Sequence, residues 1–180
     1  MWLCDQQFGF GRETFYTDSG VNNYEGSYVN SMKHGNGIFT WANGSYFHGQ
    51  FVEDKLSGEG LMRFTDGRQY IGTWDMNEMH GEGVFTWPDG RWYEGKYYYG
   101  RKNGPGIMEI KEEVYVESET EEEGQYVTKI TRYDGNWSMG QQHGQGYIIV
   151  TVNGKLKSTS KLGNWERGQL IYWSKNPGEE

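Results

Sequence analysis

Three histidines are the side chains of this 180-residue sequence best suited to metal binding or proton transfer. His34, His80 and His143 each precede a Gly-x-Gly segment. If His34 and His80 are separated by four strands spaced about 4.8 Å apart, their imidazoles lie roughly 19 Å from each other. One metal ion cannot bridge that distance, because its ligands bind at about 2 Å. We therefore expect each histidine to make a local hydrogen bond in a turn.

The other catalytic patterns are incomplete. The His-Gly-x-Gly strings resemble oxyanion-hole loops of α/β hydrolases, but no G-x-S-x-G elbow accompanies them. The Gly-x-Gly pairs do not extend to the G-x-G-x-x-G of phosphate-binding turns. Cys4 is the single cysteine, so it has no intrachain disulfide partner, and no catalytic motif surrounds it. We therefore expect a protein that is not an enzyme and has no cofactor and no metal site.

The charge balance narrows the possible partners. The net charge is −8, from 17 basic and 25 acidic residues. Binding to nucleic acid needs clustered Lys and Arg, so we expect no nucleic-acid partner. The same balance disfavours strong binding to anionic lipid. Because neither a secretory signal nor an apolar run of about 20 residues occurs, we expect a cytoplasmic protein.

Glycine and aromatic residues dominate the composition. The chain has 28 glycines together with 8 Trp, 14 Tyr and 8 Phe. Disordered segments are poor in aromatic residues, and glycine is unfavourable inside helices. The composition therefore predicts a β-rich fold with an aromatic core.

The glycines and aromatic residues recur every 23 residues. Four columns keep this step: Gly26, Gly49, Gly72 and Gly95; Gly35, Gly58, Gly81 and Gly104; Tyr24, Phe47, Tyr70 and Tyr93; Tyr28, Phe51, Trp74 and Tyr97. Several columns in the same register identify a true repeat, because chance would not align them over four units.

Each unit is predicted to form two strands. The first, at 24–28, places two aromatic residues and a glycine on one face, where a large side chain from the next strand can cover the glycine. The second strand, at 37–41, ends in Asn43-Gly44, which predicts a type I′ hairpin turn. The Gly35-x-Gly37 pair is expected to form the other, looser turn. Stacked units then give an antiparallel meander of roughly a dozen strands.

The repeats resemble the MORN repeat (membrane occupation and recognition nexus). The resemblance rests on Tyr24-Glu25-Gly26-Ser27-Tyr28, His34-Gly35-Asn36-Gly37, Asn43-Gly44, Tyr70-Ile71-Gly72-Thr73-Trp74, His80-Gly81-Glu82-Gly83 and Pro88-Asp89-Gly90. It extends from Trp2 to about Trp165, with departures at Ser57 and Asn103 in the histidine column. The expected fold class is all-β: an elongated single-layer antiparallel meander of 23-residue hairpin repeats.

The resemblance predicts one repeat array over residues 1–180. Its parts are a partial repeat at 2–23, regular repeats at 24–106, an insertion at 107–132, a repeat at 133–154 and a terminal half repeat at 155–175. The insertion contains eight glutamates against three basic residues. We expect a lengthened hairpin with an acidic tip, which is either a solvated loop or a docking site for a basic partner. The docking candidates are Glu117, Glu119, Glu121, Glu122 and Glu123.

Aromatic residues are the candidates for partner binding. A single-layer sheet cannot bury all of them, and exposed aromatic residues favour protein interfaces. Trp92, Tyr98 and Tyr99 lie outside the repeat columns and are the first candidates. Trp74, Tyr97 and Trp173 are further candidates, although Trp74 and Tyr97 also occupy columns expected to form the core. The open sheet edges, including the apolar strand at 170–173, could pair with a second copy or a peptide.

The resemblance implies a non-catalytic scaffold for protein–protein interactions. Related arrays organise cytoskeletal, ciliary or membrane-associated assemblies, which makes those locations possible for this chain. The partner would be a protein, with an extended peptide or a helix on the sheet. Two alternatives remain open: a phospholipid-binding module, with weak lipid contact, and an accessory region of a larger enzyme such as a lipid kinase or methyltransferase.

Overall fold

The computed structural model describes residues 2–3, 6–117, 124–153, 155–156 and 160–174. The chain divides into two compact units. Unit 1 is Met1–Pro88 with Tyr97–Gly100, and unit 2 is Asp89–Lys96 with Arg101–Glu180. The described residues contain strands, turns and loops and no helix, so no described segment could cross a membrane as a helix.

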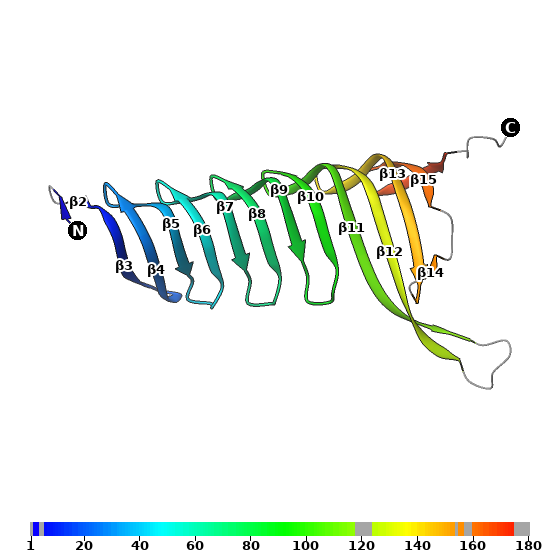
Figure 1. The fold of residues 1–180 in the computed structure, drawn as a ribbon, viewed down its shortest axis with the longest axis horizontal. Coiled ribbons are helices and arrows are strands. Elements are labelled where there is room, and N and C mark those ends of the chain that lie inside the picture. Colours follow the sequence, from blue (N-terminus) through cyan, green and yellow to red (C-terminus); the bar gives the residue numbers. More distant parts are fainter. Residues whose placement is uncertain (1, 4–5, 118–123, 154, 157–159, 175–180) are drawn as a thin grey trace. The chain divides into compact units, whose positions relative to one another are not determined.

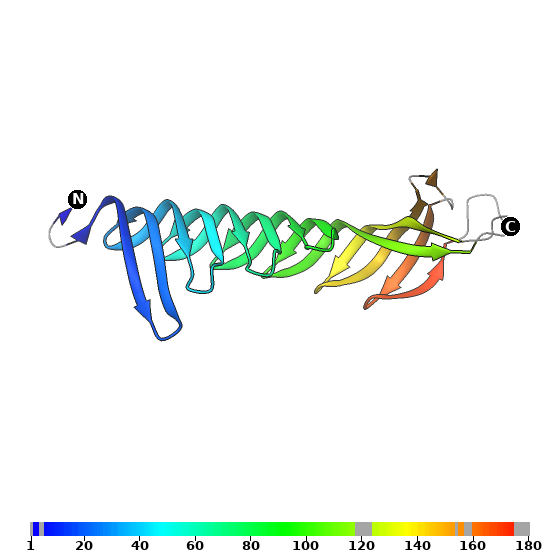
Figure 2. The same cartoon turned by 90° about the horizontal axis from the view of Figure 1, so that it is seen from below.

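The sheet strands begin in unit 1 (Figure 1). They are β3 (Gly9–Thr17), β4 (Gly20–Val29), β5 (Met32–Thr40), β6 (Tyr46–Val52), β7 (Lys55–Arg63), β8 (Gln69–Asp75) and β9 (Glu78–Thr86). A separate pair, β1 (Trp2–Leu3) and β2 (Gln6–Gln7), precedes them. Within unit 1, the β3–β4 hairpin extends beyond the loops of the hairpins that follow it (Figure 2).

The remaining strands are β10 (Trp92–Tyr98), β11 (Arg101–Val116), β12 (Gln125–Ser138), β13 (Gln141–Val152), β14 (Lys155–Leu156), β15 (Lys161–Glu166) and β16 (Gln169–Trp173). From β3 to β13, and then β15 and β16, the strand order in the sheet follows the chain order. The sheet is antiparallel and does not close. The predicted all-β meander is confirmed.

The insertion forms the long arms of β11 and β12. Their register runs without a shift from Gly104 opposite Trp137 to Val116 opposite Gln125. Tyr115 and Tyr126 face each other near the end of the arms, with ring centroids 5.3 Å apart. Glu117 is exposed beside them. The tip candidates Glu119, Glu121, Glu122 and Glu123 lie outside the described residues.

The turns differ from the prediction. Asn43-Gly44 is not a type I′ turn, because only Gly44 has a positive φ, at 87°. Strand β5 ends at Thr40 and β6 begins at Tyr46, so a five-residue loop remains. Gly44 N donates to Trp41 O across 2.9 Å, and the Asn43 carboxamide accepts from Ser45 N. This is a type I turn closed by a left-handed glycine, which suits a longer hairpin loop.

The two-residue turns with two positive φ values occur at the opposite end of the hairpins. The first three of these turns along the chain are Asn30-Ser31, Glu53-Asp54 and Met76-Asn77, whose residues have φ between 49° and 74°. The predicted turn at Gly35-x-Gly37 is therefore wrong, since both glycines lie inside β5. A register shift between β4 and β5 accommodates the left-handed Gly35 as a bulge.

The inward glycines make room for a ring from their own repeat. Gly26 and Gly37 are Cα partners on adjacent strands, and the Tyr24 ring lies over both. Its hydroxyl donates to Ser27 O across 3.0 Å. Tyr70, Tyr93 and Tyr133 repeat this bond with the carbonyl three residues later. The expectation that a side chain from the next strand covers the glycine is thus wrong: the tyrosine two residues earlier does so.

These rings form continuous edge-to-face ladders within each unit. In unit 1 the centroid distances are 5.2–5.4 Å along Tyr28, Tyr24, Phe51, Phe47, Trp74, Tyr70 and Tyr97. In unit 2 the ladder is Tyr93, Trp137, Tyr133 and Trp165. Edge-to-face contact at this distance is the preferred aromatic geometry. The ladder buries the aromatic core of a sheet that has no second layer.

Burial raises the pKa of several tyrosines of the ladders. The pKa of Tyr24 and that of Tyr133 rise to about 12, through burial first and then through the nearby charges of Asp54 and Asp134. Burial also raises the pKa of Tyr70. The folded protein therefore retains phenolic protons that the unfolded chain loses above about pH 10.

This difference predicts alkaline destabilisation. The contribution of these tyrosines to the free energy of unfolding is complete below about pH 10. It falls as the pH rises toward 12, because the unfolded state there binds fewer protons than the folded state. Urea unfolding midpoints measured from about pH 9 to about pH 12 should fall across this window. Tyr24→Phe should flatten the decline, and an identical decline in that variant would contradict the assignment.

The turns also connect successive repeats. The second turn residue donates its backbone N–H to a strand carbonyl of the preceding repeat: Asp54 to Lys33 at 3.0 Å and Asn77 to Leu56 at 3.1 Å. The side chains of the same two residues accept the return bond from the backbone N–H of Lys33 and Leu56, each at 2.9 Å. Each turn is therefore fastened to the previous repeat by a reciprocal pair of hydrogen bonds.

Removing one such acceptor should lower the stability of the repeat array. Asn77→Gly retains the left-handed backbone but leaves Leu56 N without its acceptor, which should cost about 1 kcal/mol of unfolding free energy. Asn77→Asp keeps an acceptor, as Asp54 does naturally, and should be close to neutral. Urea denaturation of both variants checks this, and equal losses in the two would exclude the hydrogen bond as the cause.

Candidate functional site

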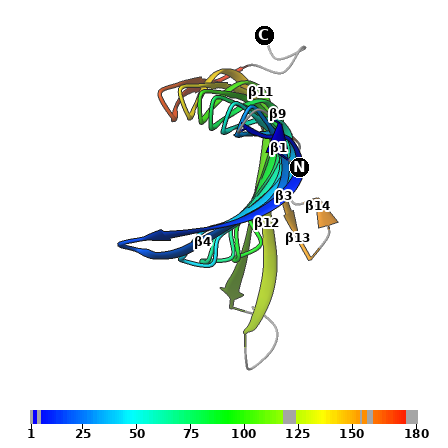
Figure 3. The same ribbon diagram turned by 90° about the vertical axis from the view of Figure 1, so that its left-hand side faces the viewer.

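The ladder face of unit 1 contains an apolar groove. Strands β4 to β9 curve so that their two ends lie on the same side of the sheet (Figure 3). The hollow has a volume of about 620 Å³. Its lining residues are Lys33, Phe39, Trp41, Phe51, Asp54, Leu56, Met62, Phe64, Trp74, Asn77, Glu78 and Met79.

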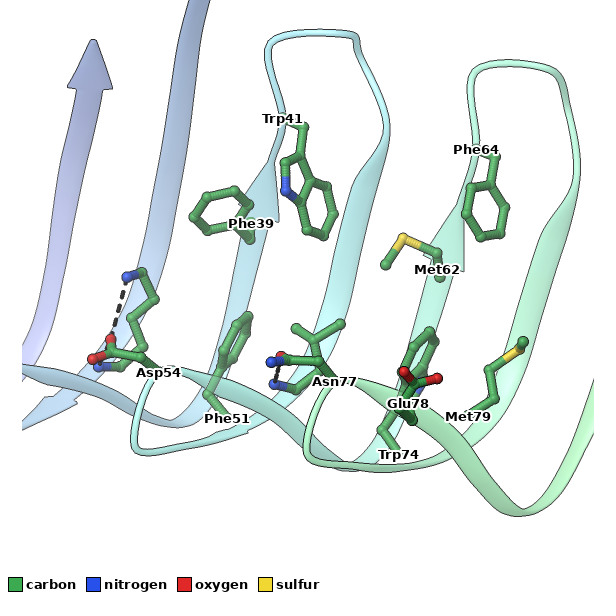
Figure 4. Close-up of a pocket in the computed structure, with 12 residues that line it drawn as sticks. Phe39, Trp41, Phe51, Asp54, Met62, Phe64, Trp74, Asn77, Glu78 and Met79 are labelled. Atoms are coloured by element: carbon green, nitrogen blue, oxygen red, sulfur yellow. Dashed lines mark hydrogen bonds and ion pairs between the residues drawn. The ribbon is translucent and has the colours of Figure 1, made fainter. Parts of the chain in front are cut away.

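The residues that line the groove come from β5 to β9 and their loops (Figure 4), and they divide into a buried floor and half-exposed walls. The floor consists of the buried residues Phe51, Leu56, Met62 and Trp74. The walls are the half-buried residues Phe39, Trp41, Phe64 and Met79. Aromatic residues and methionine are enriched in the centres of protein interfaces, where they bury large apolar areas.

Polar groups of the groove lie toward the two-residue turns. Lys33 Nζ is 3.3 Å from Asp54 Oδ1, and it also lies 4.8 Å from the ring centroid of Phe15. The Asn77 side chain accepts a hydrogen bond from Leu56 N, and the exposed Glu78 is the first residue of β9. The groove is thus apolar along its length, with its charged and amide groups along the turn side.

The lining follows the 23-residue repeat. Six pairs of lining residues are separated by that step: Lys33 and Leu56, Phe39 and Met62, Trp41 and Phe64, Phe51 and Trp74, Asp54 and Asn77, Leu56 and Met79. The groove therefore consists of two equivalent halves, one from each of two successive repeats, with Glu78 and Met79 of the next repeat beside them.

Two candidate binding residues lie in the core of unit 1. Trp74 is 7% exposed and Tyr97 is 5% exposed. The Trp74 ring contacts Phe47 and Tyr70, and its Nε1 donates to Gly60 O. One face of Trp74 also contributes to the groove floor. Tyr97 contacts Tyr70 and takes no part in the groove lining.

Tyr98 and Tyr99 form a separate exposed cluster with His80. They are 52% and 49% exposed. The His80 ring lies 5.5 Å from Tyr98 and 4.8 Å from Tyr99. His80 Nδ1 is buried and has no hydrogen-bond partner, so the expected turn hydrogen bond is not observed at this nitrogen. Tyr99 occupies the left-handed region with φ 44°, which is uncommon for a bulky residue.

The other candidates lie in unit 2. Trp92 is half-buried in β10, and Trp173 is exposed in β16 with Lys161 Nζ 5.7 Å from its ring centroid. Neither lines the groove of unit 1. Among the described parts of the chain, no three His, Cys, Asp or Glu side chains gather closely enough to hold a metal ion.

Lys102 packs over the ladder of unit 2. Its Nζ lies 4.6 Å from the ring centroids of both Tyr93 and Trp137. Burial and the charge of Arg91 lower the pKa of Lys102 to about 8. The equivalent repeat positions of unit 1 are Lys33, Leu56 and Met79, which line the groove.

Sequence reasoning missed the wall residues of the groove. Phe39 and Trp41 are two positions apart in the strand predicted at 37–41, and Phe64 repeats Trp41 after 23 residues. This repetition of large side chains in the second strand was the available signal. Their joint exposure depends on the curvature of the strands, which the pattern does not encode.

A comparison with protein families matches the MORN repeat at residues 24–46, 47–67, 70–90, 93–110 and 133–148. These matches cover more than half of the sequence, and the chain belongs to the MORN repeat family. Such repeats are found in proteins that interact with membranes or with other proteins. A comparison with curated proteins gave no match.

Proposed function

We propose that this protein is a non-catalytic scaffold that binds a protein segment in the apolar groove of unit 1. The groove itself supports the proposal, because a concave apolar surface of this size is typical of a binding site. Its buried aromatic floor provides the kind of pocket in which interface anchors concentrate. The cytoskeletal, ciliary and membrane-associated assemblies named above are proposed settings for this scaffold.

The charges beside the groove favour a basic partner. The charged residues that line the groove are two carboxylates, of Asp54 and Glu78, and one amine, of Lys33. Complementary charge steers association and selects partners. An anionic phospholipid headgroup would meet this acidic edge unfavourably, so a protein segment is the preferred occupant.

Polar substitution of the groove wall should abolish partner binding. Trp41→Gln combined with Phe64→Gln removes two half-buried rings from the groove, and the chain should remain folded. Ile71→Gln is the matched control, because Ile71 is an exposed apolar residue that does not line the groove. Proteins captured from cell extract by the parent and by Ile71→Gln should be lost by the groove variant.

A captured protein, once purified, should bind the parent at least about tenfold more tightly than the groove variant in isothermal titration calorimetry. Retention by a folded groove variant would refute the groove as the site. A further variant with Trp92, Tyr98 and Tyr99 changed to alanine tests the first candidates from the sequence. Binding of the parent to anionic vesicles without any protein partner would favour the lipid-binding alternative.

A further inference from the structure

We infer that the occupant of the groove is a basic amphipathic helix with two apolar anchors about seven residues apart. This inference rests on the proposed function and specifies the partner of the same site. Three independent features of unit 1 support it: the hydrogen bonding of the sheet backbone, the spacing of the two groove halves and the charge along the turn side of the groove.

The sheet backbone excludes an extended peptide from the groove face. Strands β5, β6, β7, β8 and β9 pair with their neighbours in antiparallel registers, with a bulge between Gly49 and Phe51 and another between Gly72 and Trp74. Most of their backbone N–H and C=O groups are therefore engaged within the sheet. An extended peptide buried against an apolar sheet face would leave its own backbone groups without partners, at a large energetic cost. A helix satisfies its backbone internally and presents only side chains.

The spacing of the two halves fits the helical repeat. Equivalent residues such as Trp41 and Phe64 lie two strands apart, which corresponds to about 9.6 Å across the sheet. Seven residues of an α-helix rise about 10.5 Å and return to the same helix face. A helix that crosses the strands can therefore place one apolar anchor in each half. Anchors five residues apart would point to different sides of the helix.

The acidic residues on the turn side of the groove indicate that the facing flank of the helix is basic. Asp54 and Glu78 line the groove on this side. Asp54 is already paired with Lys33, whereas Glu78 is an exposed carboxylate at the start of β9. Lysine or arginine residues on one flank of the helix would complete the pairing, in the manner of amphipathic helices that bind apolar grooves.

Synthetic helices can test these features without knowledge of the natural partner. The probe is a labelled peptide of three heptads with leucine anchors at heptad spacing and lysines on one flank. Its matched controls are a peptide of the same composition with anchors five residues apart and a peptide with a central proline. Fluorescence anisotropy with the full chain should show at least tenfold weaker binding for both controls.

Two protein variants locate the binding. Glu78→Lys should weaken the heptad peptide about tenfold, whereas Glu82→Lys, which makes the same charge change on the same strand outside the groove, should not. Equal affinity for the heptad, shifted and proline peptides would overturn the inference. If the heptad peptide fails to bind while a captured natural partner still depends on Trp41 and Phe64, the helix is wrong and the scaffold function remains. If no protein depends on the groove, both proposals fail.

Discussion

Trp74→Ala is expected to lower the free energy of unfolding by about 3–5 kcal/mol, the usual cost of removing a large buried aromatic side chain. Trp74 joins two repeats through its contacts with Phe47 and Tyr70, each with ring centroids 5.2–5.4 Å apart. Alanine also leaves Gly60 O without the indole N–H at 3.3 Å. Urea denaturation followed by circular dichroism measures the loss.

The control for this prediction is Tyr98→Ala. Tyr98 is exposed and contacts only the surface cluster with His80 and Tyr99 among the ring pairs of the described chain, so its loss should cost about 0.5 kcal/mol or less. If Trp74→Ala left the unfolding midpoint unchanged, the ladder would not be the core of unit 1.

Gly37→Ala is the second substitution with a large expected effect. A Cβ at Gly37 would approach the Tyr24 hydroxyl oxygen to 2.5 Å and its ring carbons to 2.6–2.7 Å. Tyr24 cannot retreat easily, because its ring packs between Tyr28 and Phe51 and its hydroxyl donates to Ser27 O. The overpacking should cost about 1–3 kcal/mol and lower the thermal unfolding midpoint.

Gly11→Ala provides the matched control. Gly11 lies in a strand with an ordinary φ, as Gly37 does, but its Cβ would meet only the edge of Tyr28, at 3.3 Å. Its cost should be clearly smaller than that of Gly37→Ala. Similar losses at the two sites would indicate that strand propensity, rather than the ring over the glycine, explains the columns.

The repeat period and the strand pairs were readable from the sequence because each depends on local periodicity. Gly26 and Tyr24 share a strand face whatever the surrounding fold, since side chains alternate along a strand. The turns were misplaced because Glu53 and Met76 have no intrinsic preference for positive φ. Strand pairing on both sides imposes that conformation on them, and the hydrogen bonds of Asp54 and Asn77 reinforce it.

The candidate site was only partly predictable. Tyr98 and Tyr99 were chosen because they depart from the repeat, and the structure places them in an exposed cluster. The groove instead consists of residues that follow the repeat, such as Trp41 and Phe64. Periodicity identifies these positions as equivalent, but it does not distinguish a packed wall from an open one. That distinction depends on how the strands curve and which side chains cover them.

Site-specific photo-crosslinking tests the central claim, that the groove of unit 1 binds a protein segment, most directly. A benzophenone amino acid is introduced at Phe64 in the groove wall or at Ile71 outside the groove, and crosslinked products from cells are identified by mass spectrometry. The proposal predicts that the Phe64 probe crosslinks to a defined basic, apolar segment of another protein and that the Ile71 probe does not. Crosslinks to that protein from Ile71 alone, or to lipid alone from Phe64, would contradict it.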